Sequence, residues 1–461
     1  MIYTKLQKHQ QDIVNFSIKH QYFGVFAGYG TGKTLCILKY IDIFKIPKVL
    51  VVATKTAINT TWVEEIHKHS NFIYVSLVGT KKEKLSRLYI GLNKINNLVY
   101  KQSSVLFLIN YDGIKNIYNE LIQSNIDFIV VDESTKIKSP YTTRTKVLWS
   151  LSDNFSKKAI LTGFPITENI TELYSQIKFL TKDNPLGKNY YEFLNRYFIK
   201  HGYKHVPKRN SIKTILNEVK PFCIYISNKI IKIKETIKPI YVDLTTEQKE
   251  LLYELNQYFM VEFRKVKIDT EYVFTLINKS LQICNGFLIG TKDDKGNSEV
   301  EMMPTNKDEV LFDIIEEMDY KKNKILIWAP YRIIISKLST MFSKMDIKFE
   351  TLTGDTKNEL QVYQKFNYGK VNILLATQKK AAESLNLTNV QYAIYYANSW
   401  SNDERQNSMA RIKRLTSKFK NVFFIDLICK NSIEEKVYNA LVFKKNLIDV
   451  LKQEFHDING G

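Results

Sequence analysis

The sequence predicts an α/β protein built from two lobes of parallel sheet. Almost wholly apolar runs, such as Lys48–Thr54 and Lys324–Ala329, have the pattern of strands that are buried on both faces, as in parallel sheets. A glycine-rich stretch, Phe26–Thr34, lies between another apolar run and a predicted helix. The 461 residues allow two or three domains. We expect residues 1–235 to contain the first lobe and residues 236–461 the second.

Composition narrows the class of protein. The formal net charge of +20 indicates either a polyanionic partner or a lysine-rich solvated surface. The four cysteines are scattered without paired spacing, which argues against a disulfide framework or a zinc site. No apolar run approaches the roughly 20 residues of a membrane span. We therefore expect a cytoplasmic protein with no membrane partner.

The glycine-rich stretch has the composition of a phosphate-binding loop. Its glycines let backbone N–H groups approach phosphate oxygens, and a helix beginning near Lys33 adds the positive end of its dipole. Lys33 is expected to reach the β- and γ-phosphates of ATP, and the hydroxyl of Thr34 to hold Mg²⁺. The alternative is a glycine-rich loop without a ligand. The predicted nucleotide-binding residues of the loop are Gly28, Gly30, Thr31, Gly32, Lys33 and Thr34.

Polar residues upstream of the loop and at strand ends are further candidates. The amide of Gln10 can donate and accept together, as adenine recognition requires, although its segment also fits the start of an amphipathic helix. Because the carboxyl ends of parallel strands face the ligand crevice, Thr54 and Lys55 are predicted to contact nucleic acid. A helix cap is the alternative for this pair. The same position at the end of another strand makes Asn110 and Tyr111 candidate nucleic-acid contacts.

An acid pair ends the predicted strand that begins at Asp127. Asp132 is positioned to hold Mg²⁺ directly or through water. Glu133 is expected to polarise the water that attacks the γ-phosphate. A loop cap is the simpler alternative for two acids at a strand end. Together with the phosphate-binding loop, the pair predicts ATP hydrolysis.

The acid pair and the blocks that follow it resemble one helicase family. Asp132–Thr135 is similar to the Asp-Glu-x-His box of superfamily-two helicases. Ile160–Asn169 and Glu172–Leu180 look like the Leu-Thr-Gly-Thr-Pro block and trailing helix of its Swi/Snf-type branch. In that family the Thr-Gly element links the ATP state to the grip on DNA. The resemblance therefore implies a coupling role for Thr162 and Gly163, and two RecA-like lobes with helical insertions between them.

The second predicted lobe continues the resemblance. Ala381–Leu387 is similar to motif V of the family, although Ala382 and Ser384 replace its usual glycines. Gln406–Arg414 resembles motif VI and is expected to place two arginines on one helix face. The implied roles are an arginine finger for Arg414 and a partner for Arg411, completing the ATP site when the lobes close; an exposed basic helix is the alternative. The implied nucleic-acid contacts of this lobe are Thr353, Gly354, Thr377, Asn386 and Trp400.

The stretch between the two sets of motifs carries no nucleotide-binding pattern. Family members have helical protrusions there. In this chain it is rich in aromatic and basic residues, which either follow a DNA backbone or form a solvated face. The basic residues include Lys204, Lys208, Arg209 and Lys213.

The resemblance covers roughly Leu6–Leu447 and implies an ATP-dependent DNA translocase or helicase that uses ATP and Mg²⁺. The chain also resembles compact helicases of this branch that are encoded by large tailed bacteriophages. We therefore expect a monomer that remodels forked or branched DNA in replication, recombination or repair, with proteins of those processes as partners, in the host cytosol.

Two alternatives stay open. One is an RNA-dependent ATPase, although RNA helicases usually carry Ser-Ala-Thr where this chain has Leu-Thr-Gly-Phe-Pro. The other is a slow ATP-driven nucleic-acid-binding switch that needs a partner. Two departures from the family pattern keep this second alternative open. One is the altered motif V, and the other is the absence of the Gly-Gln that usually follows the last arginine of motif VI, here Arg414.

Overall fold

The chain divides into two α/β units, and the boundary falls between Ile231 and Lys232. The structure is a computed structural model. It describes residues 2–28, 30–96, 104–167, 169–202, 204–226, 233–265, 270–292, 298–356, 358–378, 387–414 and 417–442. Within these residues, no helix combines the length and apolar character needed to cross a bilayer.

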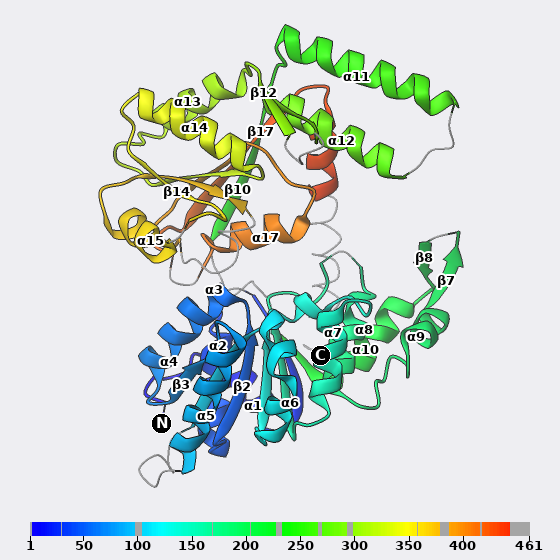
Figure 1. The fold of residues 1–461 in the computed structure, drawn as a ribbon, viewed down its shortest axis with the longest axis vertical. Coiled ribbons are helices and arrows are strands. Elements are labelled where there is room, and N and C mark those ends of the chain that lie inside the picture. The colour runs from blue at the N-terminus through cyan, green and yellow to red at the C-terminus, as the bar shows by residue number, and fades with distance from the viewer. Residues whose placement is uncertain are drawn as a thin grey trace. The chain divides into compact units, whose positions relative to one another are not determined.

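The described residues of the first unit contain a parallel sheet of seven strands in the order β3-β4-β2-β5-β6-β1-β9 (Figure 1). Parallel neighbours require crossover connections, and helices supply most of them. The carboxyl ends of all seven strands therefore lie at the same edge. The strands are β1 (Tyr22–Ala27), β2 (Lys48–Ala53), β3 (Ile73–Ser76), β4 (Val105–Asn110), β5 (Phe128–Asp132), β6 (Lys157–Thr162) and β9 (Cys223–Ile226).

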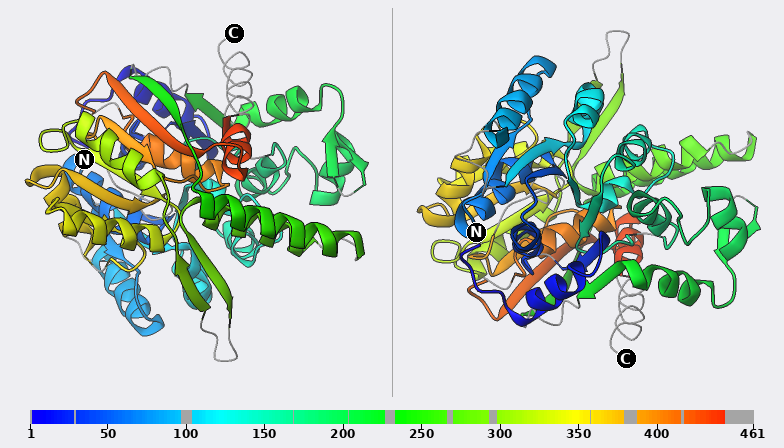
Figure 2. Two further views of the ribbon diagram at one scale, coloured as in Figure 1. Left: turned by 90° about the horizontal axis from the view of Figure 1, so that it is seen from above. Right: turned by 90° about the horizontal axis from the view of Figure 1, so that it is seen from below.

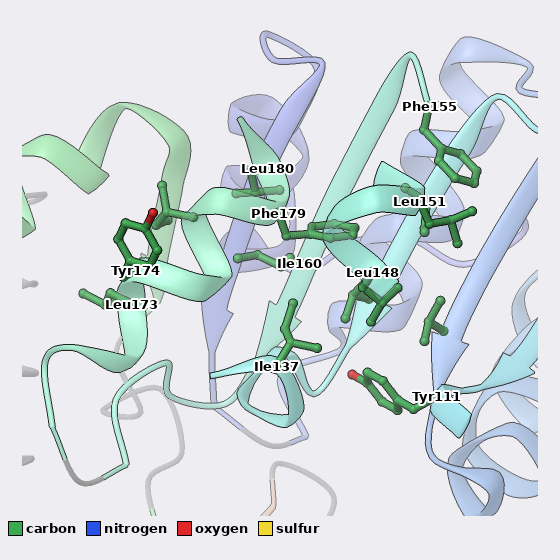
Figure 3. Close-up of a cluster of buried hydrophobic side chains, with 14 of the residues drawn as sticks. Tyr111, Ile137, Leu148, Leu151, Phe155, Ile160, Leu173, Tyr174, Phe179 and Leu180 are labelled. Carbon is green, nitrogen blue, oxygen red and sulfur yellow. The ribbon is translucent and has the colours of Figure 1, made fainter. Parts of the chain in front are cut away.

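Helices cover both faces of this sheet. The alternation along β2 makes this visible, since Leu50 and Val52 join one apolar cluster while Val49 and Val51 join the other. The helices are α1 (Lys8–Ser17), α2 (Lys33–Phe44), α3 (Lys55–Ala57), α4 (Val63–His69), α5 (Lys81–Asn96), α6 (Tyr118–Gln123), α7 (Thr143–Ser152), α8 (Glu172–Leu180), α9 (Tyr190–Tyr197) and α10 (Ser211–Val219). Figure 3 shows the part of the first cluster that α7, α8 and β6 build from Leu148, Leu151, Ile160, Leu173, Phe179 and Leu180.

Short elements complete the first unit. A π-helical turn, η1 (Ile58–Trp62), leads into α4, and single 3-10 turns follow β4 and β5. The antiparallel hairpin of β7 (Phe198–His201) and β8 (Lys204–Pro207) connects α9 to α10 (Figures 1 and 2). The 3-10 turns are η3 (Tyr111–Ile117), η4 (Ser134–Ile137) and η5 (Lys220–Phe222).

In the second unit, the described residues form a parallel sheet of six strands in the order β10-β17-β16-β13-β15-β14. The inner strand β13 (Ile325–Ala329) is buried on both faces, because Ile325 and Ile327 enter one apolar cluster and Leu326 and Trp328 enter the other. The strands are β10 (Lys234–Val242), β13 (Ile325–Ala329), β14 (Phe349–Leu352), β15 (Ile373–Thr377), β16 (Tyr392–Tyr395) and β17 (Asn421–Cys429).

Helices and a second hairpin surround this sheet. In the sequence, two long helices and the hairpin lie between β10 and the remaining elements of the unit (Figure 1). These elements are α11 (Thr246–Lys265), α12 (Thr270–Cys284), β11 (Phe287–Lys292), β12 (Ser298–Met302), α13 (Lys307–Glu317), α14 (Arg332–Lys344), α15 (Glu359–Tyr368) and α17 (Asn402–Ala410). The predicted α/β class with two parallel-sheet lobes is thus confirmed.

Candidate nucleotide-binding site

The glycine-rich loop joins the end of β1 to the start of α2, as predicted. Gly30 and Gly32 have φ values of +74° and +82°, in the left-handed region that glycine enters without steric cost. The ammonium of Lys33, the first residue of α2, donates to the carbonyl oxygens of Ala27 at 2.7 Å and Gly28 at 3.3 Å. The lysine charge therefore lies against the loop at the amino end of a helix, where an anion is favoured.

Two side chains of α1 hold the loop from outside. Nε2 of His9 contacts the carbonyl oxygen of Thr31 at 2.9 Å, and Nε2 of Gln10 donates to the same oxygen at 3.1 Å. Oε1 of Gln10 accepts from the N–H of Gln7 at 2.9 Å. A Cβ atom on Gly32 would lie only 2.3 Å from Nε2 of Gln10, so this glycine permits the close packing. Both ends of the Gln10 amide are thus engaged within the protein, and its reading of adenine stays a prediction.

The loop residues differ in how far they are exposed. Thr31 is fully buried, and its hydroxyl donates to the carbonyl oxygen of Gly28 at 2.7 Å. Thr34 is half-buried in the first turn of α2, where the predicted Mg²⁺-holding hydroxyl belongs. His9 was missed from the sequence, because a lone histidine in an amphipathic helix carries no local signal of its contact.

The acid pair lies at the end of β5. Oδ2 of Asp132 accepts from the indole N–H of Trp62 at 2.9 Å, and Oδ1 accepts from the N–H of Glu133 at 3.0 Å. Glu133 has φ +56° and ψ +57°, a left-handed conformation that is uncommon for a residue with a side chain. The pair is therefore held in a defined geometry, and its strained residue is the predicted water-polarising acid.

Tyr111 stabilises this turn from the neighbouring loop. Its hydroxyl donates to the carbonyl oxygens of Asp132 at 2.5 Å and Glu133 at 3.1 Å. Burial, and then the carboxylates of these two acids, raise the pKa of Tyr111 well above its usual value, so the hydroxyl remains a donor. Tyr111 is therefore buried beneath the acid pair and supports its turn, and its predicted contact with nucleic acid stays a prediction.

The register of the sheet brings the predicted groups to one edge. β6 lies between β5 and β1, so that Thr162 pairs with Phe26 of the phosphate-loop strand while Leu161 pairs with Asp132. The strand that carries the predicted coupling residues Thr162 and Gly163 is therefore flanked by the strands of the two ATP motifs. The arrangement provides a lysine, a hydroxyl and two carboxylates at one edge.

A buried network extends from the acid pair to the Thr162 loop. The hydroxyl of Ser134 donates to Oε1 of Gln176 at 2.7 Å. Nε2 of Gln176 in turn donates to the carbonyl oxygens of Pro165 at 2.7 Å and Glu172 at 3.0 Å. In the loop itself, the Thr162 hydroxyl donates to the carbonyl oxygen of Phe164 at 3.2 Å.

A second arm of this network involves an ion pair. Lys138 donates to the hydroxyl of Thr167 at 2.5 Å and lies 3.2 Å from a carboxylate oxygen of Glu172. The N–H of Thr167 donates to Glu172 at 2.6 Å. Burial raises the pKa of Glu172, although Lys138 and the bonds from Thr167 oppose the change. The loop after Thr162 is therefore tied both to α8 and to the turn that follows the acid pair.

The strand-end candidates of the first unit take different positions. The Thr54 hydroxyl oxygen accepts from the N–H of Ala57 at 3.2 Å, which is the helix cap that was the alternative role. Lys55 is exposed and Asn110 is half-buried at the end of β4. Their contact with nucleic acid stays a prediction.

In the second unit, α17 ends earlier than predicted. The helix stops at Ala410, so Arg411 and Arg414 do not lie on one helix face, and Arg411 is only 5% exposed. The carbonyl oxygen of Arg411 accepts from the N–H of Leu387, and fully buried Ile412 enters the apolar core, which draws the chain away from the helix axis. The expectation of a shared helix face is corrected, and so is the alternative of an exposed basic helix.

A buried ion pair fixes α17 to the sheet. The guanidinium of Arg405 binds the carboxylate of Asp426 in β17 through two bonds, of 2.5 and 2.8 Å. Its Cζ atom also lies 3.5 Å from the centre of the Tyr395 ring. Both charged side chains are almost fully buried. The pair anchors the helix that precedes Arg411 and Arg414, and no pattern in the sequence predicts it.

The remaining candidates of the second unit are local parts of the fold. Thr353 and Gly354 form the turn after β14, and a Cβ atom on Gly354 would lie 2.4 Å from the Arg332 guanidinium. Thr377 is buried at the end of β15. Trp400 packs against an apolar cluster of its own unit that includes Leu281, Val437 and Leu441. Asn386 lies outside the described residues, as do Ala382 and Ser384 of the motif V resemblance.

Comparison with known proteins gives two family matches. Residues 5–287 match the SNF2-related domain, and residues 306–416 match the helicase conserved C-terminal domain.

Curated relatives align with nearly the whole chain at low identity. An uncharacterized ATP-dependent helicase of Mycoplasma pneumoniae is 22% identical over 99% of this chain and 43% of its own length. The ISWI chromatin-remodeling complex ATPase ISW1 of Saccharomyces cerevisiae is 21% identical over 98% of this chain and 41% of its own. The human DNA excision repair protein ERCC-6-like is 22% identical over 97% of this chain and 41% of its own length. The chain thus spans less than half the length of these relatives.

A solved structure was also matched. The Sulfolobus solfataricus SWI2/SNF2 ATPase core in complex with dsDNA is 20% identical, with a TM-score of 0.41, over 99% of this chain and 95% of that one.

Proposed function

The chain belongs to the SNF2-related family, whose domain model matches more than half of its length, and on this premise we propose that it is an ATP-dependent DNA translocase. The observation that carries the proposal is the order of strands at one sheet edge. The strand leading to Thr162 lies between the phosphate-loop strand and the acid-pair strand. This order supports a coupling between hydrolysis of ATP and a change in the grip on DNA.

The chemistry of the donors fits ATP with Mg²⁺. The ion prefers hard oxygen ligands and commonly takes one or two protein groups with phosphate oxygens and waters. The Thr34 hydroxyl and the Asp132 carboxylate would supply those groups, and the bound ion would neutralise charge on the phosphates. The positive φ values of Gly30 and Gly32 would let loop N–H groups approach the phosphates of bound ATP.

Side chains of the protein are assigned the other roles in ATP hydrolysis. We assign to Lys33 the neutralisation of the terminal phosphates, and to Glu133 the orientation of the attacking water. Tyr111 and Trp62 act as positioning residues, because they hold the backbone and the carboxylate of the acid pair. Arg411 and Arg414 are proposed to contact the phosphates during hydrolysis, a role in which an arginine contributes on the order of 10³–10⁵ in rate in other nucleotide hydrolases.

The proposed partner is DNA. A net charge of +20 favours binding of a phosphate backbone, and relatives named for chromatin remodelling and DNA excision repair support DNA over RNA. Phosphate contacts carry no sequence information, so no sequence preference is proposed. As a finer proposal, the substrates are forked or branched DNA that is remodelled in replication, recombination or repair.

Steady-state ATP turnover tests this function. Turnover is measured at one fixed low salt concentration without nucleic acid and with single-stranded DNA, duplex, fork, four-way junction and RNA, because a strongly basic protein binds any polyanion at low ionic strength. We expect strong stimulation by duplex or branched DNA and none after Lys33→Ala. A Lys19→Ala variant, at an exposed lysine outside the site, serves as the control and keeps wild-type turnover. Stimulation by RNA alone would contradict the proposal, as would turnover that no nucleic acid changes.

A further inference from the structure

The hairpin between α9 and α10 is a basic surface that the ATP site does not use. Its strands pair Ile199 with Val206, Lys200 with His205, and His201 with Lys204. The hairpin extends away from the seven-stranded sheet of its own unit (Figures 1 and 2). We use the name basic hairpin for Phe198–Arg209 together with Lys213 in the first turn of α10.

The charge of this region is of one sign. Residues 193–217 contain no aspartate or glutamate. Lys200, Arg209 and Lys213 are exposed, and among the described residues none of these three has a carboxylate within ion-pair distance. Arg196 and Lys208 are exposed as well. The six lysines and arginines of the stretch are Arg196, Lys200, Lys204, Lys208, Arg209 and Lys213.

Arg196 and Lys208 differ from Lys200, Arg209 and Lys213 because they have contacts within the protein. Nζ of Lys208 donates to the carbonyl oxygens of Asn195 at 2.6 Å and Arg196 at 3.2 Å, where α9 ends. Arg196 donates to the carbonyl oxygen of Pro185 at 3.1 Å and lies 3.7 Å from a carboxylate oxygen of Glu218. These contacts fix the base of the hairpin to its unit. The folding of this region therefore explains Lys208 and Arg196 but not Lys200, Arg209 and Lys213.

The base of the hairpin is also anchored by packing. Phe198 is buried, and its ring centre lies 5.4 Å from that of Phe193. In contrast, Ile199 and Val206, which face each other across the strands, are 57% and 49% exposed. The hairpin thus presents a small aliphatic surface beside cations on a fixed base. Such a surface matches the phosphates and the apolar sugar faces of a nucleic-acid backbone.

We infer that the basic hairpin is a DNA-backbone contact, in which Lys200, Arg209 and Lys213 bind phosphates next to the Ile199–Val206 pair. This inference rests on the proposed function and adds a contact surface that lies outside the helicase motifs. Lysine and arginine on an acid-free surface favour a polyanion through counterion release, and they do so without regard to base sequence.

The salt dependence of DNA binding tests the inference. The variant Lys200→Ala/Arg209→Ala/Lys213→Ala is compared with wild type on a labelled duplex over a series of salt concentrations. Removal of each phosphate-binding cation is expected to reduce the slope of log K against log salt by about 0.9, so the slope of the triple variant falls by about 2 to 3. The conservative variant Lys200→Arg/Lys213→Arg is expected to keep the wild-type slope, because it retains the charges.

A matched control separates a local contact from the total charge. Lys19→Ala/Lys81→Ala/Lys82→Ala removes the same charge from exposed positions on another part of the first unit. We expect this control to change the slope by less than the hairpin variant. Equal reductions of the slope in the two variants would overturn the inference, as would an unchanged slope in the hairpin variant, the result expected if the hairpin binds an acidic protein instead. The thermal unfolding midpoints of all variants are measured alongside. Equal midpoints show that a change in slope does not result from unfolding.

The same preparations distinguish this inference from the proposed function. If DNA binds and stimulates ATP turnover in the wild type while the hairpin variant keeps its slope, only the hairpin contact is overturned. If the wild type neither binds duplex DNA nor responds to it, both are overturned. A reduced slope together with unchanged turnover in the absence of DNA supports both.

Discussion

The hydroxyl of Ser134 donates a hydrogen bond to Oε1 of Gln176 at 2.7 Å, and both side chains are fully buried. Ser134 directly follows the acid pair, and Gln176 donates from its other end to the carbonyl oxygen of Pro165 in the Thr162 loop. One side chain therefore joins the turn after the acid pair to the loop predicted to couple hydrolysis to DNA. If the turn at Ser134 or the loop at Pro165 moves, the hydrogen bonds of Gln176 must break or Gln176 must move with that segment.

Gln176→Leu is expected to weaken this coupling more than it weakens hydrolysis itself. The change leaves buried polar groups of Ser134 and Pro165 without their partner, which costs on the order of 1–3 kcal/mol for each group. The ratio of DNA-stimulated to DNA-free turnover should fall roughly fivefold or more. Gln11→Leu, at an exposed position of α1, serves as the control and keeps the ratio. A variant that only unfolds more easily, with an unchanged ratio, would show that Gln176 has a structural role alone.

Gly32→Ala is expected to abolish tight ATP binding. Its φ of +82° is costly for alanine, by about 1–2 kcal/mol, and the added Cβ would lie 2.3 Å from Nε2 of Gln10. Gly202→Ala is the matched control, since Gly202 also has a positive φ of +60° but open space around the new Cβ. Nucleotide titration and thermal unfolding of both variants check this. Equal loss of ATP affinity in the two would contradict a specific role for the packing of the loop on α1.

Breaking the Arg405–Asp426 pair should destabilise the second unit strongly. Arg405→Ala leaves the carboxylate of Asp426 buried without its partner, and such a change typically costs about 3–5 kcal/mol. Asp355→Ala is the control, because Nη1 of Arg332 donates to both carboxylate oxygens of Asp355 at 2.8 Å, but on the surface. Loss of an exposed pair costs about 1 kcal/mol or less. Denaturant unfolding measures both, and similar costs would argue against the anchoring role of the buried pair.

Tyr111→Phe removes the donor that holds the carbonyl oxygens of the acid pair. We expect turnover to fall while ATP binding is retained, because the change affects the positioning of Glu133 and not the phosphate loop. Turnover and nucleotide affinity are measured on the same preparation. Tyr118→Phe, at a half-buried tyrosine whose hydroxyl contacts Ser150, is the control and keeps its turnover. Wild-type turnover in Tyr111→Phe would contradict the positioning role.

The raised pKa of Tyr111 also predicts an alkaline dependence of stability. Its folded pKa lies above the unfolded value of about 10, so the favourable contribution is fully present below about pH 10 and is lost as pH rises toward the folded pKa. The difference in unfolding midpoint between wild type and Tyr111→Phe should therefore be constant from neutral pH to about pH 10 and decrease above it. A difference that grows with alkaline pH would have the wrong sign.

Contiguous patterns along the sequence determined the fold class and singled out the candidate ATP-site residues. Almost wholly apolar runs such as the one from Lys48 to Ala53 indicate strands buried on both faces, and this requirement is local. The glycines before Lys33 and the acids after Val131 are likewise recognised within short segments. Their chemistry depends on neighbours in sequence, so it can be predicted without knowing the tertiary contacts.

Only the tertiary structure decided which side chains support those groups. Trp62 contacts Asp132 across 70 positions of sequence, and Ser134 contacts Gln176 across 42. The early end of α17 likewise follows from the burial of Ile412, although the sequence around Arg411 favours a continued helix. Each of these contacts depends on packing between distant segments, and no periodicity within one segment encodes it. The sequence thus determined which reactive side chains are present, and packing between distant segments decided which contacts position them.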